Sequence, residues 1–535
     1  MNASPRFGLF LAASVWLGGC AATSRTAPPT PPETAPSPTP AAPAALPAAM
    51  TVPAVPLRRP APLETVVLSN PQSPIVSFRL VFHTGSVDDP PGREGLTALT
   101  ANLLSQGGTR ELTSSQLLEV LFPMAAELEA FTDKEFTTFS GRVHKDFLPR
   151  FLKVFTDVLI EPRYEPSEFE RLRTDALNTL RNTLRNEDDE ELGKVGLDAL
   201  LFRGHPYAHF VGGTAQGLQA ITLDELKVHA RRVFTQDRLV IGLAGPVDAA
   251  LQQSLTSRLS ALPATGAPRV ALPPVTARPG AALVLQKSTL STAISLGFAT
   301  PMRRGDPDFF PVALALSYLG EHRQTHGLLF QELREKRGLN YGDYAYAEHF
   351  IQQSGTTFAR PNLARTQQDI SLWLRPVVPA TAVFATHGVL YYLGQLVQHG
   401  IPRDAFEQTR GFLLSYTRLW EQTDPRRLGY ALDSLFYGTP DFLGSYRKAL
   451  EQMTPESVHE AVRRRLRPEA LSFVFVTQDA PALVTGLTAQ APTPLTYASA
   501  KPPAVLEADQ AILQQPLPLR PDAIEVLPAS TFMEQ

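Results

Sequence analysis

The stretch 89–109 reads D-P-P-G-R-E-G-L-T-A-L-T-A-N-L-L-S-Q-G-G-T, and the rest of the chain is interpreted from it. Its Pro-Pro-Gly start (90–92) predicts a turn, and the pair Gly107–Gly108 predicts the end of the helix between them. Leucines at helical spacing predict a face that packs into a core: Leu96, Leu99 and Leu103. The stretch therefore predicts a turn and then a core helix of about three turns.

A second face of this helix carries small residues at spacing i, i+3, i+4 and i+7: Ala98, Ala101, Asn102 and Ser105. An alanine side chain has no lone pair, and the amide of Asn102 is a poor metal ligand. This face therefore keeps a helical frame but lacks the residue types that bind a metal.

The run 330–341, F-Q-E-L-R-E-K-R-G-L-N-Y, is the most specific in the chain. Arg334 is predicted late in a helix that Gly338 can end, and Tyr341 is predicted to begin the next strand. A guanidinium and a phenol hydroxyl can both donate hydrogen bonds to a substrate carbonyl and to the oxyanion that develops on it. On the residues alone, the simpler interpretation is structural: Arg334 pairs with a nearby Glu, and Tyr341 lies at a sheet edge.

A helix-then-strand pattern occurs twice, at 222–245 and 454–477. Thr222 corresponds to Thr454 at an offset of 232 residues, and Gly95-Leu96 and Gly327-Leu328 stand at the same offset. The repeat predicts an α+β fold of two similar α/β half-domains, each a sheet covered by helices, related by internal duplication.

The two runs together resemble the insulinase/pitrilysin metallopeptidases, the inverted zincins, and in particular their mitochondrial-processing-peptidase-like branch. In that family the second helix face carries His-x-x-Glu-His, where two imidazoles hold zinc and the Glu activates water. The resemblance places these three positions at Ala98, Ala101 and Asn102, so it implies a degenerate zinc motif. A further Glu of the family falls near Leu177–Asn178, where neither residue is a carboxylate, although Asp175 is close.

The run 330–341 resembles the family's second signature, an Arg followed seven residues later by a Tyr. The resemblance implies that Arg334 and Tyr341 reach the scissile peptide from the half opposite the zinc. In the short, two-domain branch, two chains face each other, and one supplies zinc while the other supplies this pair.

We therefore expect a non-zinc-binding subunit of a heterodimeric zinc peptidase that acts on peptides or unfolded segments. By the same resemblance this chain binds no cofactor, the zinc belongs to a homologous partner subunit, and activity requires that partner. The alternative is a non-catalytic peptide-binding or scaffold lipoprotein of the cell envelope.

The N-terminal residues 1–20 contain Arg6, a short apolar run (7–17) and then Leu-Gly-Gly before Cys20, the only cysteine. They resemble a bacterial lipoprotein signal that is cleaved before a lipidated cysteine. The apolar run is too short to span a bilayer. We expect a lipid anchor at Cys20 and a periplasmic location, with Ala21 favouring the outer membrane; a secretory signal with a chance cysteine is the alternative.

The chain is predicted to divide into six parts: signal peptide 1–20, Pro/Ala-rich tether 21–62, N-terminal peptidase-like domain 63–263, linker 264–280, C-terminal peptidase-like domain 281–480 and Pro-rich extended tail 481–535. The net charge is −3 and 19% of residues are charged. This balance argues against nucleic acid as a partner.

Other chemistry has weak signals. His322 and His326 have the i, i+4 spacing of a metal-binding pair, with Glu321 adjacent, but Gly320 and Gly327 bracket them and suggest a loop. His205 and His209 have the same spacing, broken by Pro206, and are expected to be structural. Four further histidines are expected at the surface: His83, His144, His229 and His459. The sequence contains no G-x-S-x-G elbow and no phosphate-binding P-loop.

Overall fold

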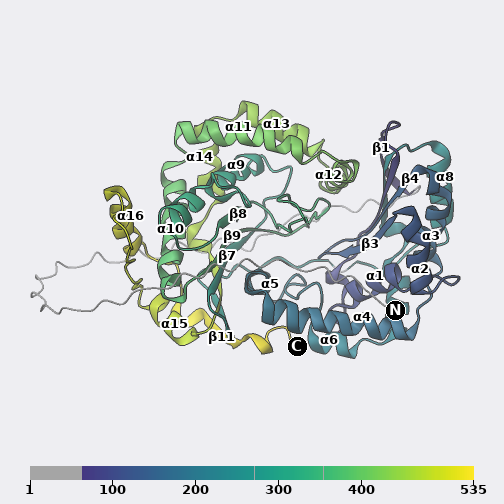
Figure 1. The fold of residues 1–535 in the computed structure, drawn as a ribbon, viewed down its shortest axis with the longest axis horizontal. Helices are drawn as coiled ribbons and strands as arrows, with labels where there is room; N and C mark the ends of the chain where they lie inside the picture. The colour runs from purple at the N-terminus through teal and green to yellow at the C-terminus, as the bar shows by residue number, and fades with distance from the viewer. Residues whose placement is uncertain (1–62, 270, 354) are drawn as a thin grey trace, which may run out of the picture. The chain divides into compact units, whose positions relative to one another are not determined.

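The computed structural model describes residues 63–269, 271–353 and 355–535, which belong to one compact unit (Figure 1). The predicted signal peptide, tether and lipidated Cys20 lie outside the described residues. Within the described ranges, no helix combines the length and the apolar character needed to cross a membrane.

The first half contains a five-stranded sheet in the order β1-β5-β2-β4-β3. Its strands are β1 (Glu64–Ser69), β2 (Ile75–Phe82), β3 (Glu127–Thr132), β4 (Thr137–His144) and β5 (Leu239–Gly245). The alternating apolar residues of β2 face the helices, and all four are buried: Val76, Phe78, Leu80 and Phe82. The accompanying helices are α1 (Leu96–Gln106), α2 (Ser114–Leu121), α3 (Leu148–Ile160), α4 (Pro166–Asn178), α5 (Asp189–Leu201), α6 (Ala215–Ala220), α7 (Leu223–Val233) and α8 (Ala249–Leu259).

The second half contains a six-stranded sheet in the order β11-β6-β10-β7-β9-β8. Its strands are β6 (Ala282–Gln286), β7 (Thr292–Thr300), β8 (Asp343–Tyr346), β9 (Gln368–Val377), β10 (Ser472–Thr477) and β11 (Ile524–Pro528). The accompanying helices are α9 (Phe309–Gly320), α10 (Ala382–His399), α11 (Arg403–Leu419), α12 (Asp424–Tyr437), α13 (Phe442–Gln452), α14 (Pro455–Arg465), α15 (Ala480–Thr488) and α16 (Pro503–Leu513).

The two halves repeat one topology, as the 232-residue offset predicts. Without β11, the second sheet has the first sheet's order, with β6, β10, β7, β9 and β8 in place of β1, β5, β2, β4 and β3. The repeat extends to helix starts, because Thr222 caps α7 and Thr454 caps α14, each accepting from the backbone N–H three residues ahead. The α+β fold of two duplicated half-domains is confirmed.

The halves exchange one helix each. Helix α5 of the first half packs on β7 and β10 of the second sheet, whereas α12 of the second half packs on β1 and β5 of the first. Figure 1 shows α5 beside β7 and α12 beside β1. Glycines allow the close approach: a Cβ at Gly196 would lie 2.9 Å from Val474 Cγ1, and one at Gly242 would lie 3.0 Å from Leu432 Cδ1. The exchange therefore joins each sheet to a helix of the opposite half.

The segment 481–535 is not the extended tail that its prolines predict. It forms α15, α16 and β11, and β11 pairs in parallel with β6, with Ile524 opposite Ala282. Prolines occupy the first turns of both helices, where a missing N–H costs nothing. The segment ends against the first half, where the carbonyl of Met533 accepts from the N–H of Ala215 at 3.0 Å and Glu534 pairs with Arg185 at 2.7 Å.

Candidate functional site

A cavity of about 660 Å³ lies between α1, α5 and the second sheet. Ala98 and Asn102 of α1 line it, as do Asp198 of α5 and Asp369 of β9. The predicted zinc-helix face therefore opens into a cavity that both halves of the chain line.

The zinc-helix positions do not fit a zinc ion. Ala98 and Asn102 line the cavity, while Ala101 is buried among apolar side chains. Two methyl groups and one amide cannot supply two imidazoles and a water-activating carboxylate. Asp175, the carboxylate nearest the family's further Glu position, instead pairs with Arg171 at 3.0 Å on an exposed face.

The helix itself is firmly built. The carboxylate of Asp89 accepts from the backbone N–H groups of Gly95 and Thr97 at 2.8 and 2.7 Å, and from the Thr97 hydroxyl at 2.6 Å. A carboxylate at a helix N-terminus satisfies donors that have no partner within the helix. His229 Nε2 lies 2.9 Å from Thr97 Oγ1 and is buried, so the expectation that His229 is a surface residue is wrong.

Arg334 and Tyr341 lie together. Arg334 belongs to the π-helical stretch η6 (Phe330–Glu335), and its guanidinium carbon is 4.9 Å from the centre of the Tyr341 ring and 4.4 Å from that of Phe330. Tyr341 is 69% exposed, and Gly338 ends the stretch with φ +69°. Arg334 Nη1 is also 3.2 Å from Glu335 Oε1.

The pair adjoins the cavity through Arg375. Arg375 lines the cavity, its guanidinium carbon lies 5.4 Å from the centre of the Tyr341 ring, and its Nε is 3.5 Å from Glu190 Oε2. A ligand that extended out of the cavity past Arg375 would meet the hydroxyl-bearing ring of Tyr341.

A buried ion pair forms the floor beside this cavity. Arg365 donates from Nε and Nη2 to the two carboxylate oxygens of Asp133 at 2.7 and 2.6 Å. Burial alone would raise the pKa of Asp133, but Arg365 outweighs it and brings the pKa to about 2. Lys134 donates to the carbonyl of His209 at 2.7 Å, and burial lowers its pKa to about 8.

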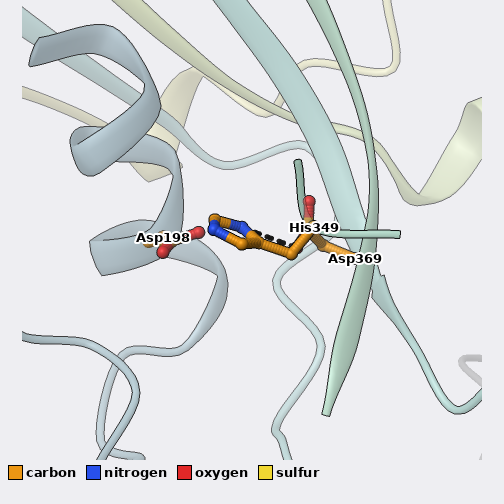
Figure 2. Close-up of side chains that lie close together, drawn as sticks. All are labelled: Asp198, His349 and Asp369. Carbon is orange, nitrogen blue, oxygen red and sulfur yellow. Dashed lines mark ion pairs between the residues drawn. The ribbon is translucent and has the colours of Figure 1, made fainter. Parts of the chain in front are cut away.

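Three further donors converge beside this pair, as Figure 2 shows. Asp198, His349 and Asp369 come from α5, the loop after β8, and β9, and their ligand atoms all lie within 4.8 Å of one another. Burial, and then Arg365, lowers the pKa of His349 to about 4. Burial, and then Asp198, raises the pKa of Asp369 to about 7.

Sequence reasoning missed this cluster. Asp198 and His349 are separated by most of a half-domain and share no motif spacing. The one local signal is Asp369, a charged residue at the start of a strand rich in apolar residues. Only the crossing of α5 onto the second sheet brings the three together.

The predicted histidine pairs do not form metal sites. His322 Nδ1 lies 2.5 Å from the Tyr346 hydroxyl, and burial lowers its pKa to about 4, whereas the His326 ring packs on Phe412. His205 is buried and structural, as expected, because its Nδ1 accepts from the N–H of Tyr207 at 3.1 Å.

His83 and His144 were both predicted to be exposed to solvent, and they differ in the structure. His83 was expected in solvent but packs against Phe136 and Phe436, because α12 covers this face of the first sheet; burial lowers its pKa to about 3. His144 is half-exposed, and its Nδ1 accepts from the N–H of Asp146.

Two family profiles match the chain. The family described as "Insulinase (Peptidase family M16)" matches residues 64–213, and "Peptidase M16 inactive domain" matches residues 220–411. The chain belongs to the insulinase family. Its second match contains both Arg334 and Tyr341.

The relatives of this insulinase-family chain include proteins named as zinc proteases and a protein named as a non-peptidase homolog. An uncharacterized zinc protease of Mycobacterium tuberculosis is 26% identical over 387 residues, which cover 71% of this chain and 84% of the relative. A non-peptidase homolog of Helicobacter pylori is 22% identical over 408 residues, covering 76% and 89%. The crystal structure of a peptidase M16 inactive domain from Pseudomonas fluorescens superposes with a TM-score of 0.67 at 20% identity, covering 78% and 96%, and confirms the fold. The match to the inactive-domain profile and the likeness to a non-peptidase homolog support a zinc-less member of the family.

Proposed function

We propose that this insulinase-family chain is the subunit of a heterodimeric zinc peptidase that does not bind the catalytic zinc. In this proposal Arg334 and Tyr341 hold the carbonyl of a peptide substrate and the oxyanion that develops on it. A homologous partner subunit carries the zinc, which supplies the activated water. This chain holds no cofactor at its degenerate zinc helix.

The pairing of Arg334 with an exposed Tyr341 carries the proposal. A tyrosine that is 69% exposed gains little from packing, so burial does not account for its position over a guanidinium 4.9 Å away. Phe330 lies against the Arg334 guanidinium, and Arg375 lies against the Tyr341 ring, so each side chain has a neighbour that limits its movement. Donors that are held in place before the reaction stabilise charge that appears only in the transition state.

Each donor has a distinct role in this scheme. The Tyr341 hydroxyl donates one hydrogen bond to the carbonyl oxygen, and the Arg334 guanidinium contributes positive charge and further donors. Arg334 must release Glu335, a sequence neighbour at 3.2 Å, or share its guanidinium with it. Because that contact is at the surface, its loss costs well under about 1 kcal/mol.

The experiment is a peptidase assay on this chain alone and co-expressed with a homologue that has an intact His-x-x-Glu-His motif, with zinc measured in each sample. We expect activity only in the co-purified pair. Tyr341→Phe should lower kcat by about 100-fold without changing assembly, since one oxyanion donor is lost. Tyr391→Phe, on the half-exposed side of α10, is the matched control and should leave activity unchanged.

The second candidate function is a non-catalytic peptide-binding or scaffold lipoprotein. The Arg334–Glu335 ion pair and the relative named as a non-peptidase homolog favour it. Failure of the two chains to pair, with no activity in either sample, would support this candidate, as would full activity of the Tyr341→Phe pair.

We further propose that Cys20 carries a lipid that anchors the protein to the periplasmic face of a membrane, the outer one in a two-membrane cell. The proposal rests on the signal-like sequence 1–20. Cys20→Ser should move the protein from the membrane fraction to the soluble fraction, measured by fractionation and immunoblot. Unchanged membrane retention would show that the anchor lies elsewhere.

A further inference from the structure

The Asp198–His349–Asp369 cluster brings an imidazole and two carboxylates to one wall of the cavity (Figure 2). His349 Nδ1 lies 3.9 Å from Asp369 Oδ1, which is beyond hydrogen-bond range. His349 Nδ1 and Asp369 Oδ1 therefore face each other without forming a hydrogen bond.

The gap has the size that a metal ion requires. Ligand atoms bound to one ion at about 2.0–2.2 Å stand about 3.0–3.5 Å apart at tetrahedral or octahedral angles. The cluster's atoms, 3.9 Å apart for one pair and all within 4.8 Å, would reach those separations with side-chain shifts on the order of 1 Å or less.

An unpartnered atom points to a missing ligand. Asp369 is only 3% exposed, yet its Oδ1 has no hydrogen-bond partner. A buried carboxylate oxygen without a partner costs free energy unless a proton or a cation reaches it.

The neighbouring cations do not fill this role. Arg365 donates from Nε and Nη2 to Asp133 while its Nη1 has no hydrogen-bond partner, and Lys134 donates to a backbone carbonyl. Lys134 Nζ and Arg365 Nη1 each lie 3.8 Å from Asp198 Oδ2, and neither residue forms an ion pair with Asp369. The carboxylates of Asp133, Asp198 and Asp369 therefore lie near two cationic side chains, Arg365 and Lys134. This count leaves one negative charge that a bound cation would offset.

We propose that Asp198, His349 and Asp369 bind a divalent transition-metal cation at a site separate from the family's zinc helix. One imidazole nitrogen and two carboxylate oxygens suit Zn²⁺ or Mn²⁺ better than Ca²⁺, which takes six to eight oxygens. All three residues line the cavity, so the ion's remaining positions are open to water or to a carbonyl or carboxylate group of a bound molecule.

The site also joins the two halves. Asp198 belongs to the helix that the first half places on the second sheet, whereas Asp369 belongs to that sheet. A bound ion therefore fastens α5 to β9 and to the loop of His349. This inference does not depend on the proposed peptidase role, because it concerns this chain without a partner.

The test is isothermal titration of the purified chain, stripped with EDTA, with ZnCl₂, MnCl₂ and CaCl₂ in turn. We expect one Zn²⁺ or Mn²⁺ per chain and no saturable Ca²⁺ binding. Asp369→Asn and His349→Ala should each weaken binding at least 10-fold. Asn102→Ala is the control on the zinc helix and should bind as the unmodified chain does.

Visible absorption of the Co²⁺-loaded chain gives a second readout, because loss of the imidazole in His349→Ala should change the spectrum even if affinity is kept. The proposal is overturned by less than one ion per chain, or by equal binding to the unmodified chain and both ligand variants. Loss of binding in Asn102→Ala alone would place the ion at α1 instead. A negative result leaves the peptide-cleavage readout of the pairing experiment unaffected, because the proposed catalytic zinc belongs to the partner subunit and not to this site.

Discussion

Replacing Leu428 by Ala tests the helix exchange between the halves. Leu428 is 0% exposed and belongs to α12, a second-half helix that packs on the first sheet beside Gly242. Removing three buried carbons costs the lost transfer free energy plus a cavity term, so we expect the free energy of unfolding to fall by about 3 kcal/mol. Leu197→Ala makes the reciprocal change, because Leu197 of α5 is 2% exposed on the second sheet.

Equilibrium unfolding in urea distinguishes coupled halves from independent ones. Trp373 and Trp420 both lie in the second half, so tryptophan fluorescence reports mainly that half, whereas far-ultraviolet circular dichroism reports both. If the exchanged helices couple the halves, each substitution shifts one common transition seen by both probes. Leu419→Ala, at a 40% exposed position, is the control and should change stability by less than about 0.5 kcal/mol.

Two results would refute this reasoning. Separate transitions by fluorescence and circular dichroism in the unmodified chain would show that the halves unfold independently. A loss below about 1 kcal/mol in Leu428→Ala would show that α12 is not firmly packed on the first sheet.

Two further predictions concern the backbone and a buried acid. Gly95→Ala should lower the melting temperature, at a cost of about 1–3 kcal/mol, because Gly95 has φ +99° and an added Cβ would lie 2.9 Å from Gly213 Cα; an unchanged melting temperature would contradict this. Burial raises the pKa of Asp343 from 3.8 to about 8. Because the unfolded chain releases this proton near pH 4 and the folded chain keeps it to about pH 8, this residue's contribution to stability falls as pH rises through that window. Asp343→Asn should therefore gain stability relative to the unmodified chain between pH 5 and pH 8, measured by urea titration, and a constant difference would rule out the mechanism.

The duplicated topology could be predicted from the sequence because its signals are local. Thr222 and Thr454 mark helix starts through their own side chains, and alternating apolar residues mark β2 directly. The proximity of Arg334 and Tyr341 could also be predicted from the sequence, because Gly338 allows the chain to turn between them. The turn at Gly338 brings Arg334 and Tyr341 together without any contribution from distant parts of the fold.

The remaining features depend on contacts between residues far apart in the sequence, which local sequence patterns do not predict. The apolar faces of α5 and α12 predict burial, but not that each lies on the sheet of the other half. Asp198 and Asp369 meet only as a result of that crossing. In the last segment, prolines that suggest an extended chain instead begin helices, and Leu483 and Leu487 supply enough apolar surface to dock α15.

The contacts of the last residues have a consequence for how the protein is made. The carbonyls of Met533 and Glu534 accept from the N–H groups of Ala215 and Gln216, and the Glu534 carboxylate reaches Arg185, 349 residues earlier in the chain. A ribosome therefore finishes the second half before the first half can acquire all its partners. A nascent chain leaving the ribosome must keep an incomplete first half until residue 534 has been added, and a truncation that removes Met533 and Glu534 should destabilise the first half.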